Sequence, residues 1–315
     1  MSNTPRRHHY VPKAYMCRFS DGNGLVYTLS KDNEKIQGTP NNRAYVKNLC
    51  VEKDFYMLHN DKNNLDDSVE KILAKFEDDV PNELFKNIPP DLLFPFQDGG
   101  AVLDMRQRIL LIDAIAIQIA RGKATRKYGL SVVKSYYDIA LNELKDKLKD
   151  DPNRDIHLAF LRQNREMIKS NALIEGAVIE LMKHGHDSLL IDNLQRRNCF
   201  LLINTTDIDF ITSDEPVLIC DAASKEAGIF KCSLDSPWSV VYYPLDPKHL
   251  VALYTAEYCG GIRSNTCNAI VLGNNDKKFI SDFNWLQYQQ CHRCVIANKK
   301  ESLDSISYRI LSPSV

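Results

Sequence analysis

Long apolar runs are absent from this chain of 315 residues, because nowhere do about 18 apolar residues follow one another. The first residues are polar and basic, with no apolar segment behind them, so we expect neither a membrane span nor a secretory signal. The nine cysteines, some of them in apolar runs, are typical of free thiols in a reducing compartment. We therefore expect a soluble protein of the cytoplasm.

An excess of charge of one sign is also lacking. The chain carries 40 basic and 41 acidic side chains, for a formal net charge of −1. Proteins that coat nucleic acid non-specifically usually show a broad basic excess, so this class is disfavoured. A local basic patch remains compatible with the balance, and the N-terminus is its candidate place, since Arg6, Arg7, Lys13 and Arg18 all precede the first acid, Asp21.

The familiar nucleotide and hydrolase motifs are missing as well. The chain has no phosphate-binding loop, dinucleotide fingerprint, nucleophile elbow or zinc-protease motif, which weakens the case for ATPases, nicotinamide enzymes and serine hydrolases. We expect no nucleotide cofactor. Cys291 and Cys294 flank a histidine and an arginine like half of a zinc site, but a second ligand pair is lacking, so both thiols fit a core position equally well.

What the chain does have is a helical pattern followed by a strand pattern. Apolar spacing predicts helices over 66–80, 104–121, 131–149 and 155–183. From about residue 199 short strands are predicted, with a late helix over 276–294 and a closing strand over 306–311. The fold class is therefore α+β, with a helical N-terminal and middle region packed against a C-terminal mixed or antiparallel sheet.

Length and composition permit one large domain. With 44% hydrophobic residues the chain can bury a sizeable core, and single domains reach roughly 250–300 residues. We expect one integrated domain over 1–315. It is compatible with two lobes, a mainly helical one over 1–195 and a strand-rich one over 196–315 that contains the late helix.

The N-terminal residues Arg7, His8 and His9 form the first candidate site. Two adjacent histidines on an extended segment point to opposite sides, so only one of them faces a given site. Histidine acts as a general base, phosphate donor or metal ligand near neutral pH, and Arg7 favours an anionic substrate. The alternative is a docking segment, in which Tyr10 and the residues after it pack into a groove while the histidines hydrogen-bond.

The second candidate is Thr212-Ser213-Asp214, which ends a short apolar run and is followed by Glu215 and Pro216. Such a position places a carboxylate and two hydroxyls at a strand edge or turn, where catalytic and binding groups often lie. A turn closed by the Ser or Asp side chain before Pro216 explains the same residues without any chemistry. Both interpretations stay open at this point.

The third candidate lies on the central helix, 104–121, which is apolar over most of its circumference. Gln118 and Arg121 are three residues apart and share a face of this helix. Arg121 either binds a phosphate or pairs with a core carboxylate such as Asp113 or Glu77, since a buried arginine needs a partner.

Several of these residues carry a resemblance to a known family. The N-terminal segment from His8 to Pro12, followed by Tyr15, Arg18 and Phe19, resembles the start of the bacterial family catalogued as domain of unknown function 4238. Further matching points occur in the expected order: Asn48, Asp54, Phe55, Tyr56, Glu77, Gln118, Arg121, Phe210 to Asp214, Pro216, Tyr243, Pro244, Leu245 and Asn284. The similarity spans nearly the whole chain, which favours one integrated domain.

One position departs from the family pattern. The family usually has Asn between the Asp and the Pro of its Thr-Ser-Asp motif, where this chain has Glu215. We expect the added negative charge either to weaken anion binding nearby or to face solvent. The resemblance implies no established reaction, so it supports the choice of site residues more than the choice of chemistry.

The leading hypothesis is a nuclease or related phosphodiester hydrolase acting on nucleic acid, as an effector of bacterial defence against phage. It needs a base, a residue that orients substrate or water, groups that bind phosphate, and a divalent cation, Mg²⁺ or Mn²⁺. The catalytic candidates are His8, His9, Asp214 and Gln118; the substrate-binding candidates are Arg7, Arg121, Thr212 and Ser213; the metal ligands are Asp214 and Glu77.

Two alternatives belong to other classes. The first is a non-catalytic module whose N-terminal arm and Arg121 recognise a nucleotide or a partner protein, and the second is a nucleotide-dependent transferase. A reaction is favoured if His8 or His9, Asp214 and Arg121 line one cleft. Scattered positions, with the histidines buried, favour a scaffold role. The exposed amphipathic helices are compatible with a homodimer or a protein partner.

Overall fold

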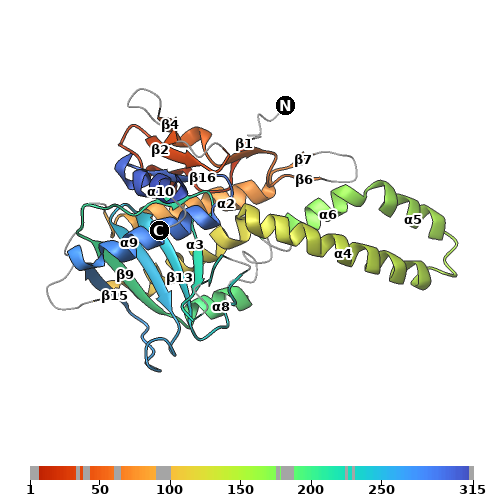
Figure 1. Ribbon diagram of the computed structural model, residues 1–315. Helices are drawn as coiled ribbons and strands as arrows, with labels where there is room; N and C mark the ends of the chain where they lie inside the picture. The colour runs from red at the N-terminus through yellow and green to blue at the C-terminus, as the bar shows by residue number, and fades with distance from the viewer. Residues whose placement is uncertain are drawn as a thin grey trace.

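The computed structural model describes residues 7–32, 36–37, 43–59, 65–89, 101–174, 178, 188–223, 226–228 and 231–311. Its elements are arranged as a body of two larger sheets with covering helices, from which a helical hairpin projects (Figure 1), and β1 with β5 and β6 with β7 form two further two-stranded sheets. The expected α+β class is confirmed. The short elements of the first 200 residues are β1 (Arg7–His9), α1 (Lys13–Cys17), η1 (Val46–Asn48), β5 (Val51–Lys53), β6 (Leu58–His59), β7 (Leu65–Asp66) and α8 (Leu189–Gln195).

The larger sheet is mixed and has seven strands in the order β12-β11-β13-β14-β9-β15-β8. Adjacent strands are antiparallel except β9 and β15, which run parallel. The strands are β8 (Ala101–Leu103), β9 (Asn198–Asn204), β11 (Leu218–Asp221), β12 (Glu226–Ala227), β13 (Ser239–Asp246), β14 (His249–Tyr254) and β15 (Cys267–Leu272).

Alternation along these strands gives the sheet two apolar faces, each covered by one helix. Successive side chains of a strand point to opposite sides, so Leu201 packs in the core cluster that contains the residues of α3 (Met105–Arg121). Its neighbour Leu202 packs with Ile280 and Phe283 of α9 (Lys277–Gln290). Both faces are therefore buried, which explains the nearly continuous apolar strand sequences.

The central helix lies where the sequence predicts it. Asp104 accepts the N–H of Gln107 at 2.8 Å and the Gln107 side chain accepts the N–H of Asp104 at 3.0 Å, a capping box that fixes the start of α3. Eleven of its residues are buried. Since α3 is buried on most sides, its two polar residues near the end, Gln118 and Arg121, must find partners inside the protein.

The smaller sheet joins the two ends of the chain. Strand β2 (Leu25–Ser30) pairs with β16 (Cys294–Ala297), β16 also pairs with β10 (Thr212–Ser213), and β3 (Ile36–Gln37) and β4 (Ala44–Tyr45) pair with β2. Helix α10 (Glu301–Leu311) packs on it through Leu303 and Ile306. The residue ranges proposed for two lobes are thus tied together by β2 and β16.

The projecting hairpin consists of α4 (Lys123–Lys147), α5 (Arg154–Gln163) and α6 (Arg165–Ile174) (Figure 1). The single helix predicted over 155–183 is wrong, because the chain breaks at Asn164, whose side-chain amide donates to the Phe160 carbonyl at 2.9 Å and competes with the helix ladder. Of the rest of that predicted helix, residues 175–177 and 179–187 lie outside the described residues.

Two other predictions are also wrong. Residues 306–311 belong to helix α10 rather than a strand, and Leu303, Ile306 and Ile310 follow the 3.6-residue period. The late helix ends at Gln290, because Cys294 already opens β16. The helix predicted over 66–80 is α2 (Ser68–Asp79), which continues past Pro81 as the π-helical turns η2 (Val80–Phe85), and η5 (Asn274–Asp276) precedes α9.

Tyr15 of α1 joins the two sheets, which leads to a first prediction. Its hydroxyl donates to the Pro244 carbonyl of β13 and shares a hydrogen bond with Thr212 Oγ1 of β10, both at 2.7 Å. Replacing Tyr15 by Phe leaves two buried groups without this partner, so the free energy of unfolding should fall by about 1–3 kcal/mol. Urea denaturation measures it.

The matched control is Tyr136→Phe, because Tyr136 is 68% exposed on α4. This substitution should change the free energy of unfolding by less than about 0.5 kcal/mol. Equal losses in the two variants would contradict the bridging role of Tyr15.

Candidate functional site

Arg121, the last residue of α3, is the buried cation around which the N-terminal segment is arranged. It is 3% exposed. Its Nε donates to the Tyr56 hydroxyl at 2.9 Å, Nη1 donates to the Glu77 carboxylate, and Nη2 donates to the His9 carbonyl. Burial opposes its charge, but Tyr56 and Glu77 raise the pKa of Arg121 above its ordinary value, so the guanidinium stays ionised.

His8 and His9 have different surroundings, as expected for neighbours on a strand. His8 is fully buried, its Nδ1 accepts the N–H of Tyr56 at 3.1 Å, and its ring stacks on the Tyr56 ring at a centroid distance of 5.9 Å. His9 is half-buried, and its Nε2 has no hydrogen-bond partner among the described residues. Burial, opposed by Glu77 and aided by Arg121 and Lys13, lowers the pKa of His9, so its imidazole is neutral at pH 7.

A small cavity of about 30 Å³ lies between α3, α2 and the N-terminal segment. Gln118, Arg121 and Glu77 line it together with the rings of Tyr15 and Tyr243. The remaining walls are mainly apolar and come from Pro12, Ala14, Phe76, Val80, Pro81, Phe85, Ala114 and Ile117. This cavity brings together three of the residues singled out from the sequence.

Gln118 is only half satisfied in this cavity. Its Nε2 donates to the Tyr10 carbonyl at 3.1 Å, and its Oε1 is buried without a hydrogen-bond partner among the described residues. Because a carbonyl oxygen accepts but cannot donate, the amide nitrogen must face Tyr10, which fixes the orientation of the amide. A residue that lines the cavity therefore carries one buried acceptor without a partner among the described residues.

The Thr-Ser-Asp motif lies elsewhere, in strand β10 of the smaller sheet and the turn that follows it. The Asp214 carboxylate accepts the N–H groups of His292 and Arg293 at 2.9 and 2.8 Å, and Ser213 Oγ donates to Gln287 Oε1 at 2.8 Å. Thr212 is the residue bonded to Tyr15. All three motif side chains are fully buried and engaged with protein groups, so the turn interpretation accounts for them.

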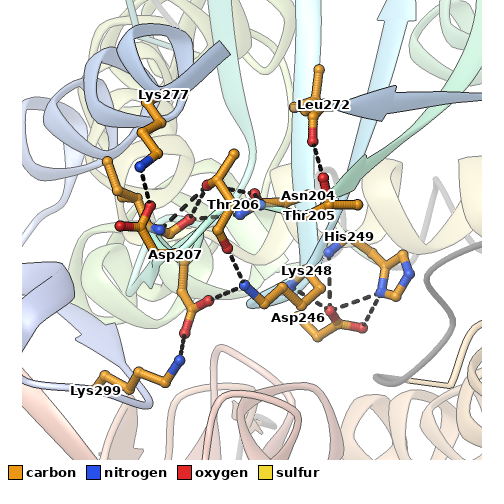
Figure 2. Close-up of polar contacts among 12 residues, drawn as sticks. Asn204, Thr205, Thr206, Asp207, Asp246, Lys248, His249, Leu272, Lys277 and Lys299 are labelled. Atoms are coloured by element: carbon orange, nitrogen blue, oxygen red, sulfur yellow. Dashed lines mark hydrogen bonds and ion pairs between the residues drawn. The ribbon is translucent and has the colours of Figure 1, made fainter. Parts of the chain in front are cut away.

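Ion pairs hold the loop that leads into this motif. Asp207 pairs with Lys277 at 2.7 Å, and the buried Asp209 lies between Lys248 at 2.6 Å and Lys299 at 2.8 Å. Figure 2 shows Lys248 also reaching the Thr206 main-chain oxygen, at 2.7 Å. Lysines from three separate segments thus form ion pairs with the loop after β9. These pairs hold the motif at the junction of the sheets.

A histidine–aspartate pair that the sequence did not single out lies beside this loop. His249 Nδ1 is 2.9 Å from an Asp246 carboxylate oxygen, and Figure 2 shows this contact as a dashed line. The same carboxylate accepts the N–H groups of Lys248 and His249 and pairs with Arg18. The pair closes the turn between β13 and β14, and both residues are fully buried, so it belongs to the scaffold.

Of the two expectations for Glu215, that it weakens anion binding nearby or that it faces solvent, the second is wrong, because its side chain is buried. It is 3% exposed, and its Oε1 accepts the N–H of Ala124 at 2.7 Å in the first turn of α4. A Cβ at Gly122 would lie 2.5 Å from Glu215 Oε2, so any larger residue there would displace the Glu215 carboxylate. Burial, opposed by the Ala124 N–H, raises the pKa of Glu215 to about 7.

The structure therefore divides the predicted site residues. Glu77, Gln118 and Arg121 line the cavity, and the His9 carbonyl accepts a hydrogen bond from Arg121. Thr212 and Ser213 form β10, Asp214 lies in the turn after it, and Arg7 is exposed on β1. The sequence did not assign a role to Tyr15, Tyr56 or Tyr243. All three are matching points of the family resemblance, which was the available signal.

The metal prediction gains no support from this geometry. In the described part of the chain, no three His, Cys, Asp or Glu side chains come together as a metal site. Glu77 pairs with Arg121, and Asp214 binds two backbone N–H groups. Among the same residues, no helix is both long and apolar enough to cross a membrane.

The family profile described as Protein of unknown function (DUF4238) matches residues 7–301. The chain belongs to this family. The resemblance seen at the N-terminal histidines and the Thr-Ser-Asp motif is thus confirmed, and both lie inside the matched region of this DUF4238 protein. Searches of curated proteins and of solved structures each found no match.

The raised pKa of Glu215 in this DUF4238 protein predicts a pH-dependent stability. Folded Glu215 holds its proton up to about pH 7, whereas the ordinary value is 4.5. Its favourable contribution is therefore complete below pH 4.5 and is lost as the pH rises to about 7. Glu215→Gln keeps an acceptor for Ala124, so it should be more stable than the wild type at pH 8, by about 3 kcal/mol.

Denaturant unfolding at pH 5 and pH 8 measures this difference, which should shrink at the lower pH. Glu166→Gln is the control, because the Glu166 side chain is 83% exposed; its stability should follow the wild type at both values. Parallel pH profiles of wild type and Glu215→Gln would show that burial does not hold the proton on this carboxyl.

Proposed function

We propose that this protein binds the donor-bearing end of a small neutral ligand in the cavity beside Arg121, whose volume of about 30 Å³ admits one small group. The observation that carries the proposal is the Gln118 Oε1 atom, a buried acceptor without a partner among the described residues. Leaving such a buried acceptor without a hydrogen bond costs about 1–3 kcal/mol. A ligand that donates a hydrogen bond to it recovers that energy, which a ligand lacking the donor cannot.

The charges around the cavity favour a neutral ligand over a phosphate. Arg121 is the cation of the cavity, and its charge is already balanced by Glu77. A phosphate would have to displace Glu77, leaving a partly buried carboxylate without its partner, which is costly. The mainly apolar walls add a favourable contact for the rest of the ligand.

The N-terminal segment forms part of this site in the proposal. Tyr10 orients the Gln118 amide, Pro12, Ala14 and Tyr15 supply a wall, and the His9 carbonyl anchors Arg121. The binding-module hypothesis predicted that this arm and Arg121 act together. Their shared cavity supports it, although the ligand favoured here is a small neutral molecule.

Small aromatic probes test the proposal, since the ligand itself is unidentified. Phenol and benzyl alcohol carry a donor, whereas fluorobenzene and toluene have a similar size and none. In ligand-observed NMR titrations the donor-bearing probes should bind about tenfold more tightly, which corresponds to about 1.4 kcal/mol. In Gln118→Leu this preference should disappear.

The control is Gln163→Leu, a like substitution at an exposed position of α5, which should leave the preference intact. Thermal melting establishes that each variant is folded. A preference that survives Gln118→Leu, or equal binding of all four probes by the wild type, would refute the role given to the Gln118 oxygen.

A second candidate function is the phosphodiester hydrolase, which one observation favours. His9 is neutral at pH 7, its Nε2 has no partner among the described residues, and Arg121 and Glu77 influence its pKa. A neutral imidazole nitrogen without a hydrogen-bond partner can act as a general base where a substrate reaches it. Arg121 would then stabilise phosphate charge, and a requirement for Mg²⁺ or Mn²⁺ stays a separate hypothesis.

Cleavage of labelled RNA and DNA, with Mg²⁺, with Mn²⁺ and with chelator, tests this candidate. The comparison is between wild type, His9→Gln and His157→Gln, since His157 is exposed on α5. If His9 is the base, cleavage should fall at least about 100-fold in the first variant alone. Absence of cleavage by the wild type under all conditions would exclude the candidate.

A further inference from the structure

A second cleft lies on the opposite face of the large sheet, between the sheet and α9. Its volume is about 220 Å³. Tyr242 and Tyr243 are neighbours on β13 and point to opposite faces, so Tyr243 lines the Arg121 cavity and Tyr242 lines this cleft. The sheet separates the two, and a ligand in one does not touch the other.

Aromatic rings dominate the walls of this cleft. Tyr242 on β13 meets Phe279 and Phe283 of α9, with ring centroids 6.0 and 5.9 Å apart in tilted, edge-to-face geometry. Tyr258, after β14, supplies a fourth ring and is 43% exposed. Rings at steep angles to one another present faces as well as edges, and the face of an aromatic ring attracts cations.

The charges of the lining have one sign. Asp221 at the end of β11 and Asp282 of α9 are the two ionisable acids among the described lining residues, and no Lys, Arg or His is among them. Asp282 is paired with Lys278 and Arg309, each at 2.8 Å, and these partners stand outside the lining. Asp221 accepts the Ala223 N–H and the Ser236 hydroxyl.

We propose that this aromatic cleft binds an organic cation of the quaternary ammonium class. The aromatic rings and the Asp221 carboxylate favour a cation over a neutral or anionic ligand, whereas Asp282 is already balanced by Lys278 and Arg309. Both carboxylates already accept hydrogen bonds, so the cleft offers little to a primary ammonium, which must replace three hydrogen bonds to water. A methylated ammonium donates none, and its methyl groups contact the apolar walls.

The size of the cleft agrees with a compact ligand. Sites for drug-sized molecules span roughly 300–1,000 Å³, and this cleft of about 220 Å³ is smaller. A tetramethylammonium or choline head group fits that class, as does the methylated head of a longer molecule whose remainder leaves through the open side.

Choline and its neutral isostere 3,3-dimethyl-1-butanol test the proposal, because they share a shape and differ in charge. Tetramethylammonium serves as a third probe. Trp238 lies 6.2 Å from the Tyr258 ring and provides a fluorescence signal beside the cleft. In titrations at constant ionic strength, set with NaCl, choline and tetramethylammonium should bind at least about tenfold more tightly than the neutral alcohol.

Variants at the exposed ring distinguish the cleft from other cation sites on the surface. Tyr258→Leu should weaken choline binding about tenfold, whereas Tyr258→Phe keeps the ring and should bind like the wild type. Asp221→Asn should weaken binding of both cations and leave the neutral alcohol unchanged. Calorimetric titration repeats each measurement independently of fluorescence, and thermal melting shows whether each variant is folded.

The contrary outcomes are equally definite. Equal affinities for choline and the neutral isostere would mean an apolar cleft without cation preference. The proposal would also be overturned if no probe bound at a concentration of about 10 mM. The same holds if folded Tyr258→Leu bound choline as tightly as the wild type does. None of these results depends on the cavity beside Arg121, so the two sites are tested separately.

Discussion

The burial of Arg121 is the constraint on which the N-terminal half of this protein depends. A guanidinium at the end of an almost fully buried helix is tolerated only if its charge and its N–H groups find partners. Here they come from three segments far apart in sequence: the His9 carbonyl of β1, the Tyr56 hydroxyl and the Glu77 carboxylate of α2. The irregular first eighty residues are thereby held against α3, and the small cavity is the space left between them.

The two faces of the large sheet carry different functional groups. Because side chains alternate along β13, one tyrosine faces α3 and the next faces α9. The α3 face has an ion pair of zero net charge and an unpaired amide oxygen, whereas the α9 face has aromatic rings and two acids. These differences follow from which elements cover each face, so one fold presents two clefts lined by different chemical groups.

The sequence predicted the layers of this fold better than the roles of its polar residues. Helix α3 and most strands of the large sheet follow from the spacing of apolar residues alone. The short apolar stretch in α10 suits either period, so the sequence predicts a strand where the structure has a helix. Asp214 has the neighbours of a catalytic aspartate in sequence, yet its role is set by the N–H groups of His292 and Arg293, 78 and 79 residues away. No local pattern contains that information, and the same is true of Glu215 and the first turn of α4.

The family motifs contain residues of two kinds, which differ in whether all of their buried polar atoms are hydrogen-bonded. Asp214 accepts two N–H groups and Thr212 and Ser213 bond to neighbouring side chains, so removing any of them would leave buried partners unpaired. That cost alone is a reason for a family to keep them. Gln118 and His9 differ, since each retains one polar atom without a partner among the described residues. These two atoms are the ones that the proposals assign to a ligand or substrate, because the polar atoms of the Thr-Ser-Asp motif are already hydrogen-bonded.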